Sequence, residues 1–282
     1  MALTDAEINA LKPDCTAAAA IEAKAENVAV GKTKLEFARC FALAVLAGMF
    51  IASGALFMTY VKSDPALPFA VSQVFGAAMF SLGLIMVIVA GAELFTGNNL
   101  MVMAALSKKI TWGQVLKNWV VVYVGNLLGS LVIVCCAFGA NCAGMNGGEV
   151  GSTMMTVAAG KIGLAPSVII FRGIMCNFLV CMAVWMGFAG RTVIDKIFTS
   201  AFPVTAFVAM GFEHCVANMF FLPMGLVAKL SGVAYTGTAN IDLITVGGIV
   251  YNIGFATLGN IIGGAVFVGV MYWIAYAKRK AE

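Results

Sequence analysis

Apolar residues in this chain form long stretches without charge, and they do not alternate with polar residues as in a β-barrel. Five such stretches cover residues 40–61, 66–92, 118–148, 173–190 and 243–277. Each is long enough to cross a hydrocarbon core of about 30 Å as an α-helix. A sixth apolar segment, residues 197–228, contains Glu213 and His214 as its only charged or titratable polar residues. The pattern therefore predicts an all-α membrane protein with six transmembrane helices.

Two of these segments carry a polar interruption. Residues 91–98 read GAELFTGN, and residues 211–220 read GFEHCVANMF. An acid inside a bilayer is costly unless it faces a partner or a water-filled cavity. Irregular backbone at that depth is tolerated only where protein covers it or where it lines a cavity. We therefore predict that the second and fifth helices are broken at these points and that the breaks line one pathway.

The two halves of the chain share motifs in the same order. One set recurs 134 positions later, as the pairs Asn118/Asn252, Gly125/Gly259, Asn126/Asn260 and Gly129/Gly263. A second set recurs 120 positions later, as Gly91/Gly211, Glu93/Glu213 and Asn98/Asn218. An internal repeat of three helices explains both sets, and an odd number of spans inverts the second copy. The glycines of the first set predict close helix packing, and Asn126 and Asn260 are candidates to bind the backbone of the breaks.

Composition and charge agree with a membrane protein. The 282 residues are 62% hydrophobic and 11% charged, which excludes a soluble globular domain. The net charge of +4 lies beside the apolar segments and does not indicate nucleic acid. Most lysines and arginines fall on one side if the N-terminus is cytoplasmic, so both termini are expected there. We expect a cytoplasmic helical segment at 1–36, a six-helix transport domain at 37–278 and a cytoplasmic tail at 279–282.

The titratable residues of the interruptions suggest transport rather than catalysis. His214 is the only histidine, and no zinc-type cysteine spacing is present, so we expect no metal and no cofactor. Glu93 and Glu213 lack a nucleophile or metal beside them, so we expect no enzyme activity. We expect both carboxylates to accept hydrogen bonds from amides of their own loops.

The sequence allows two interpretations for each of two basic residues. Lys161, in a predicted loop before the fourth helix, either draws anions towards His214 or is an exposed loop lysine. Arg172, one turn inside that helix, either lines an entrance or extends to the interface.

Several motifs together resemble the formate/nitrite transporter family over residues 37–277. They are GAELFTGN at 91–98, KNW and YVGNLLGS within 117–130, MCNFLVCMAVWM at 175–186, GFEHCVANM at 211–219 and TLGNIIGG at 257–264. The resemblance implies an aquaporin-like protomer that assembles into a homopentamer with one pore per subunit. It also implies a bacterial inner membrane and passage of small monovalent anions such as formate, nitrite or hydrosulfide.

The resemblance also implies roles for individual residues. His214 matches the central pore histidine, Thr96 the threonine facing it, Lys161 the lysine that attracts the anion and Glu213 the acid beside the histidine. Two apolar constrictions are implied at Phe80, Leu84, Leu94, Phe207 and Val180. The remaining pore candidates are Asn177, Asn126, Asn260 and Arg172. Two features resemble the nitrite and hydrosulfide branches of the family more than the formate branch. They are the motif FTGNN after the first break and Arg172.

A bare anion pays a large desolvation cost in an apolar constriction, whereas its neutral acid pays much less. We therefore expect the substrate to cross protonated or with a proton, which comes from water or through a relay from His214. The alternative is an aquaporin-like pore for small neutral solutes, although neither break contains the Asn-Pro-Ala motif of water channels. A membrane redox subunit is disfavoured because one histidine offers little for haem. Lipid and other copies of the chain are the remaining expected partners.

Overall fold

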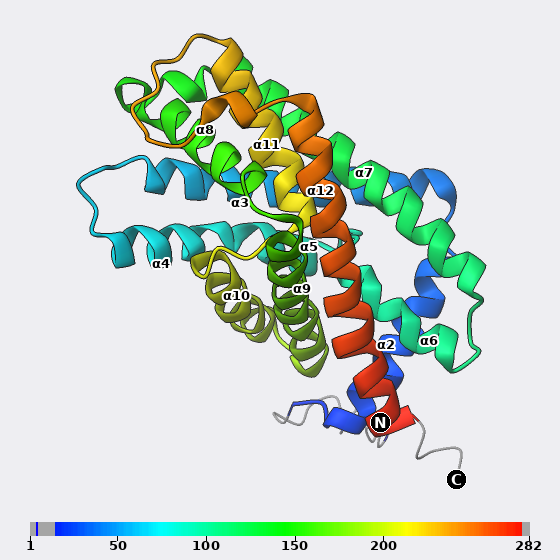
Figure 1. Ribbon diagram of the computed structural model, residues 1–282. Helices are drawn as coiled ribbons and strands as arrows, with labels where there is room; N and C mark the ends of the chain where they lie inside the picture. Colours follow the sequence, from blue (N-terminus) through cyan, green and yellow to red (C-terminus); the bar gives the residue numbers. More distant parts are fainter. Residues whose placement is uncertain (1–3, 5–14, 278–282) are drawn as a thin grey trace.

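Long apolar helices make up most of the structure (Figure 1). The computed structural model describes residue 4 and residues 15–277. Its α-helices are α2 (Ala18–Thr33), α3 (Phe37–Lys62), α4 (Phe69–Phe80), α5 (Leu82–Ala90), α6 (Val102–Leu106), α7 (Trp112–Gly139), α8 (Glu149–Ile162), α9 (Pro166–Ala189), α10 (Val193–Ala209), α11 (Cys215–Leu230) and α12 (Val246–Ile261). Short 3₁₀ turns are η1 (Gly97–Met101), η2 (Cys142–Gly144), η3 (Asn146–Gly148) and η4 (Ile241–Leu243), and α12 continues in π-helical geometry as η5 (Ile262–Val270) and η6 (Trp273–Ala277).

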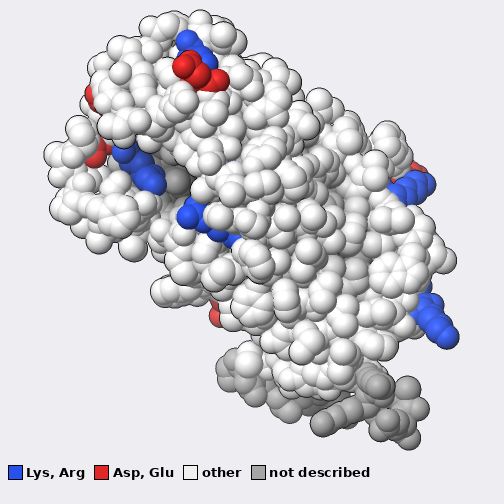
Figure 2. Space-filling model, viewed as in Figure 1, with Lys and Arg blue, Asp and Glu red and all other residues white. Residues whose placement is uncertain are grey.

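Five helical stretches among the described residues are long and apolar enough to cross a membrane. They are Phe37–Lys62, Phe69–Ala90, Trp112–Gly139, Pro166–Ala189 and Val246–Ala277. Helix α11 is also apolar but has only 16 residues. Most of the face drawn in Figure 2 carries no charged side chain, as a surface in contact with lipid requires.

Local sequence explains where several helices begin and end. Thr111 is the N-cap of α7, and its hydroxyl oxygen accepts from the Gln114 amide at 3.2 Å. The Gln114 side chain in turn accepts from the Thr111 amide at 2.8 Å, which completes a capping box. Helix α3 ends at Lys62, three residues before Pro65, whose ring cannot continue a helix.

Two segments leave helical geometry inside apolar sequence. The chain is not helical at residues 91–96, between α5 and η1, or at residues 210–214, between α10 and α11. We call these segments loop A (91–96) and loop B (210–214). The residues at the start of each loop are exposed, whereas residues 93–96 of loop A and residues 213–214 of loop B are buried, as are most of the residues that follow them.

The glycines shared by the two halves sit where helices approach most closely. Helix α3 packs along α7, and α9 packs along α12. A Cβ atom at Gly129 of α7 would lie 1.9 Å from the Val45 carbonyl oxygen, and one at Gly263 would lie 2.1 Å from that of Ile174. Only a residue without a side chain fits at such distances. The close helix packing predicted from these glycines is confirmed.

Helices α2 and α8 belong neither to the five long spans nor to the segments around loops A and B. Helix α8 occupies residues 149–162, where the sequence suggested only a connecting loop. Helix α2 lies at the same end of the molecule as η6 (Figure 1) and contacts it. Glu26 of α2 pairs with Lys109 at 2.5 Å and accepts a hydrogen bond from Ser107. Most of the expected N-terminal segment before α2, and the tail at 279–282, lie outside the described residues.

Replacing Gly129 with alanine should force α3 and α7 apart, because the new methyl group would overlap the Val45 carbonyl. We expect a loss of about 1–3 kcal/mol of stability, the usual cost of overpacking. Gly139→Ala is the matched control, because no atom lies within 4 Å of the position of its Cβ. Thermal unfolding of the purified protein in detergent measures both variants. Equal midpoints for the two would contradict the packing argument.

Candidate functional site

Glycines end the helices that lead into loops A and B. Gly91 follows α5 with φ of 79°, and Gly211 follows α10 with φ of 70°. A side chain would be strained in this left-handed region, whereas glycine adopts it freely. The glycine at the start of each loop therefore lets the chain turn out of its helix inside the bundle.

Asn126 of α7 binds loop A. Its amide group donates to the Glu93 carbonyl at 2.9 Å and to the Ala44 carbonyl of α3 at 2.7 Å. Its side-chain oxygen accepts from the Phe95 amide at 2.9 Å. The Asn126 side chain is fully buried. One asparagine thus satisfies two backbone groups of the loop in surroundings where water is not available to do so.

Asn260 of α12 binds loop B with the same set of contacts. Its amide group donates to the Glu213 carbonyl at 2.8 Å and to the Gly173 carbonyl of α9 at 2.9 Å. Its side-chain oxygen accepts from the Cys215 amide at 2.9 Å. Asn126 and Asn260 are therefore equivalent in contacts as well as in sequence position.

The two loops meet at Thr96 and His214. The Thr96 hydroxyl oxygen and His214 Nε2 are 2.9 Å apart, and both residues are buried. His214 is the N-cap of α11, and its Nδ1 accepts a hydrogen bond from the Ala217 amide at 3.0 Å. Because Nδ1 accepts, the neutral ring carries its proton on Nε2 and donates it to Thr96. The Thr96 O–H then remains as a hydrogen-bond donor.

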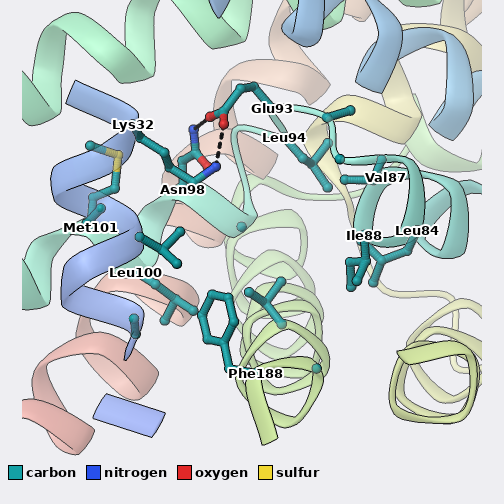
Figure 3. A pocket seen from close by; sticks show the side chains of 18 of the residues that line it. Lys32, Leu84, Val87, Ile88, Glu93, Leu94, Asn98, Leu100, Met101 and Phe188 are labelled. Atoms are coloured by element: carbon teal, nitrogen blue, oxygen red, sulfur yellow. Dashed lines mark hydrogen bonds and ion pairs between the residues drawn. The ribbon is translucent and has the colours of Figure 1, made fainter. Parts of the chain in front are cut away.

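A buried carboxylate beside loop A is held by a lysine and an asparagine (Figure 3). Lys32 of α2 reaches Glu93 with 2.6 Å between Nζ and Oε1. Asn98 donates to Glu93 Oε2 at 2.7 Å and to Asn118 Oδ1 at 2.8 Å. The positive charge of Lys32 offsets the cost of burying the Glu93 charge, and the asparagine supplies a further hydrogen bond.

The carboxylate beside loop B has an equivalent environment. Lys161 of α8 lies 2.8 Å from Glu213 Oε1. Asn218 donates to Glu213 Oε2 at 2.7 Å and to Asn252 Oδ1 at 2.7 Å. Asn252 also donates to Glu213 Oε2 at 3.2 Å. Lysine, glutamate and two asparagines therefore occur together on both sides of the Thr96–His214 contact.

Two expectations about these charged residues are wrong. Among the described residues, Glu93 and Glu213 accept from lysine and asparagine side chains and not from amides of their own loops. The loop amides bond instead to asparagine oxygens and to carbonyls of neighbouring helices. Lys161 lies in α8 and not in a loop, because residues 149–162 gain tertiary contacts with α11 that sequence periodicity does not reveal.

Two cavities open on opposite sides of the central contact. The first, of about 380 Å³, is lined by Lys32 and Glu93 and by the apolar residues Leu84, Val87 and Leu94 (Figure 3). The second, of about 330 Å³, is lined by residues that include Lys161, Glu213, His214, Phe80 and Phe207. We call them the inner and the outer cavity.

Apolar rings and the Thr96–His214 contact separate the cavities. The rings of Phe80 and Phe207 meet edge to face at 6.1 Å, and Phe207 stacks on His214 at 5.9 Å. Leu94 lines the inner cavity only two residues before Thr96. An ion that passes between the cavities therefore meets apolar side chains and two neutral hydrogen-bonding groups.

The remaining predicted residues take different positions. Asn177 donates to the Thr96 carbonyl at 3.3 Å, to Asn99 Oδ1 at 2.8 Å and to the Asn260 carbonyl at 2.7 Å, so it supports loop A from behind. Val180 is buried in the core and lines neither the inner nor the outer cavity.

Arg172 lines the outer cavity and donates to the Gly211 carbonyl at 3.4 Å.

Lys32 and Val87 belong to the site but were not singled out from the sequence. Asn98, Asn118, Asn218 and Asn252 were identified there only as members of the repeat, without a role in the site. The asparagines belong to the two repeated motif sets, so the repeat itself was the signal for them. Lys32 lies in a segment of mixed charge where no pattern distinguishes it from its neighbours.

Comparison with known proteins decides the family. The family model described as "Formate/nitrite transporter" matches residues 19–274. The chain belongs to the formate/nitrite transporter family. It is 38% identical over 269 residues to the formate channel FocA of Escherichia coli (strain K12), covering 93% of this chain and 94% of FocA. It is 39% identical over 256 residues to formate channel FocA of Haemophilus influenzae, covering 87% and 89% of the two chains.

A solved structure, "Pentameric formate channel with formate bound", is similar with a TM-score of 0.75 and 36% identity, covering 86% of this chain and 98% of that one. Family members of this kind are channels or transporters and not enzymes. Together with its apolar helices, the comparison makes the chain a multi-pass membrane protein. Both FocA relatives are formate channels by name, which gives no support to a placement near the nitrite and hydrosulfide branches.

Replacing Asn260 with leucine should destabilise loop B, because the Cys215 amide and the Gly173 and Glu213 carbonyls would lose their partner. Each buried group left without a hydrogen bond costs about 1–3 kcal/mol. Asn240→Leu is the control, since its side chain caps an exposed turn at η4. Thermal unfolding in detergent should show a large decrease for Asn260→Leu only.

Proposed function

We propose that the protein is a channel for small monovalent anions, with formate, nitrite and hydrosulfide as the substrate class. The observation that carries the proposal is the contact of Thr96 with His214 between two cavities that each contain a lysine. The names of the relatives, formate channels in two bacteria, support formate in particular. A further support is the similar pentameric structure, whose name includes bound formate.

The architecture in this proposal is an aquaporin-like bundle of six transmembrane helices in an inverted 3+3 repeat, over residues 37–278. Helices α4 to α6 form the second span, broken at loop A, and α10 with α11 forms the fifth, broken at loop B. The matching contacts of Asn126 and Asn260 support this arrangement. The subunits form a homopentamer in a bacterial inner membrane, with both termini in the cytoplasm and the outer cavity facing outwards.

Lysines concentrate the anion, and the apolar layer decides the form in which it crosses. The basic side chains that line the outer and inner cavities, Lys161 and Lys32 among them, together raise the local concentration of anions there. The rings of Phe80 and Phe207 offer no compensation for a bare charge, so crossing as the neutral acid costs far less. Substrate therefore passes the layer protonated or together with a proton.

His214 acts in this proposal as a hydrogen-bond donor rather than as the final proton source. Its Nδ1 is occupied by the Ala217 amide, so the proton on Nε2 is the only one on the neutral ring. Donating that proton to substrate would leave an imidazolate, which is strongly unfavourable. Water in the cavity is the source that fits the geometry, and Thr96 with His214 supplies hydrogen bonds to the passing acid.

Formate uptake by proteoliposomes should rise as the outside pH falls, because a larger fraction of formate is then protonated. His214→Phe should slow uptake by about tenfold at every pH, since the loss of one hydrogen bond of about 1.4 kcal/mol corresponds to a factor of ten. Thr96→Val should act in the same direction, whereas Thr96→Ser keeps the hydroxyl and serves as the control. An unchanged rate for His214→Phe would refute the role of the ring.

Substrate class is tested by comparing solutes in the same vesicles. We expect formate, nitrite and hydrosulfide to pass much faster than glycerol, measured by light scattering during swelling. Equal rates for glycerol and formate would favour the alternative of an aquaporin-like pore for small neutral solutes. A pH series for each anion shows whether all three cross in the protonated form.

A further inference from the structure

Lys62, the last residue of α3, turns into the outer cavity and not away from the protein. Its side-chain stem lies over Gly76 of α4, where a Cβ atom would be 3.0 Å from Lys62 Cγ and 3.5 Å from Cδ. Its ammonium group donates to Gln73 Oε1 at 2.7 Å, and the residue is half-buried. A lysine at a helix end normally extends its charge to the interface. Contact with α4 instead directs the Lys62 charge to the cavity wall.

Lys62 differs in its partner from Lys32 and Lys161, the two lysines beside the buried glutamates. Lys32 and Lys161 each pair with a buried glutamate, whereas the hydrogen-bond partner of Lys62 among the described residues is the neutral Gln73. Arg172 lines the same cavity and donates to a carbonyl at the long distance of 3.4 Å.

Glu213 is the one acid that lines the outer cavity among the described residues, and Lys161 already pairs with it. The cavity therefore holds two positive charges, those of Lys62 and Arg172, that no carboxylate balances. Figure 2 shows basic side chains on either side of a hollow in the surface of the molecule.

The N–H donors of Lys62 and Arg172 that have no partner in the part of the chain that the structure describes indicate which kind of ligand these two side chains bind. An ammonium group has three N–H donors, and Gln73 takes one of those on Lys62. A guanidinium has five in a planar fork, which matches the two oxygens of a carboxylate or nitrite. We propose that Lys62 and Arg172 form an anion-binding site in the outer cavity, ahead of the Phe80–Phe207 layer, for a planar anion with two oxygens. The inference rests on the proposed function and adds a recruitment step to it.

Such a site acts through charge, so its effect depends on ionic strength. Two exposed or half-exposed charges attract an anion over about 10 Å at 0.1 M salt, and this range shortens as salt is added. A cavity with one sign of charge raises the local substrate concentration by a factor of about ten or more. The site therefore lowers the formate concentration needed for half-maximal uptake, most strongly at low salt.

The test measures initial formate uptake against formate concentration, at constant pH, in vesicles that contain the full-length protein. Lys62→Gln removes the charge, and Gln73→Glu gives Lys62 an acidic partner without deleting the lysine. Both should raise the half-saturating concentration by about threefold to tenfold at low salt. High salt should reduce the difference from the wild type. Lys62→Arg keeps the charge and should resemble the wild type.

Lys229→Gln is the matched control. Lys229 ends α11 near Asp242, at 3.8 Å, and does not line the outer cavity. Superimposed curves for wild type, Lys62→Gln and Gln73→Glu would overturn the proposed site, as would equal losses in Lys62→Arg and Lys62→Gln. Absence of formate uptake by the wild type would instead refute the proposed function, so the two failures are distinguishable.

Discussion

Backbone that leaves helical geometry inside an apolar bundle has to find hydrogen-bond partners within the protein. Loops A and B satisfy this constraint through Asn126 and Asn260. Asn126 bonds two backbone groups of loop A, Asn260 bonds one backbone group of loop B and the first amide of α11, and each also bonds one carbonyl of a neighbouring helix. These bonds require α3 to lie close to α7 and α9 close to α12. Glycines such as Gly129 and Gly263 make that approach possible, because no side chain fits there. Helix packing and loop geometry therefore depend on each other.

The buried carboxylates, like the loop backbone, need hydrogen-bond partners within the protein. Each of Glu93 and Glu213 is held by a lysine and by asparagine side chains. A buried ion pair survives only when its remaining hydrogen-bonding capacity is also satisfied. Both lysines come from helices outside the long apolar spans, Lys32 from α2 and Lys161 from α8. These two short helices thus complete the cavities on either side of the apolar layer.

The two halves match in their framework and differ at the centre. His214 occupies the position in loop B that Leu94 occupies in loop A, 120 residues earlier, and Thr96 corresponds in the same way to Val216. Each polar residue of the central contact is therefore opposed by an apolar counterpart in the other half. A single hydrogen-bonding contact between apolar surfaces results.

The sequence alone was enough to predict the apolar helices, the close packing at the shared glycines and the family, because composition, periodicity and motif spacing are local or repeated properties. Tertiary structure alone decided the partners of the buried charges. Glu93 binds Lys32 across 61 positions, and Glu213 binds Lys161 of a helix that sequence periodicity did not reveal. Lys62 likewise turns inwards only because Gly76 leaves room for its stem. The pairing of charged side chains depends on how helices that are far apart in the sequence pack together. The order of residues in a single sequence does not give the distances between those helices.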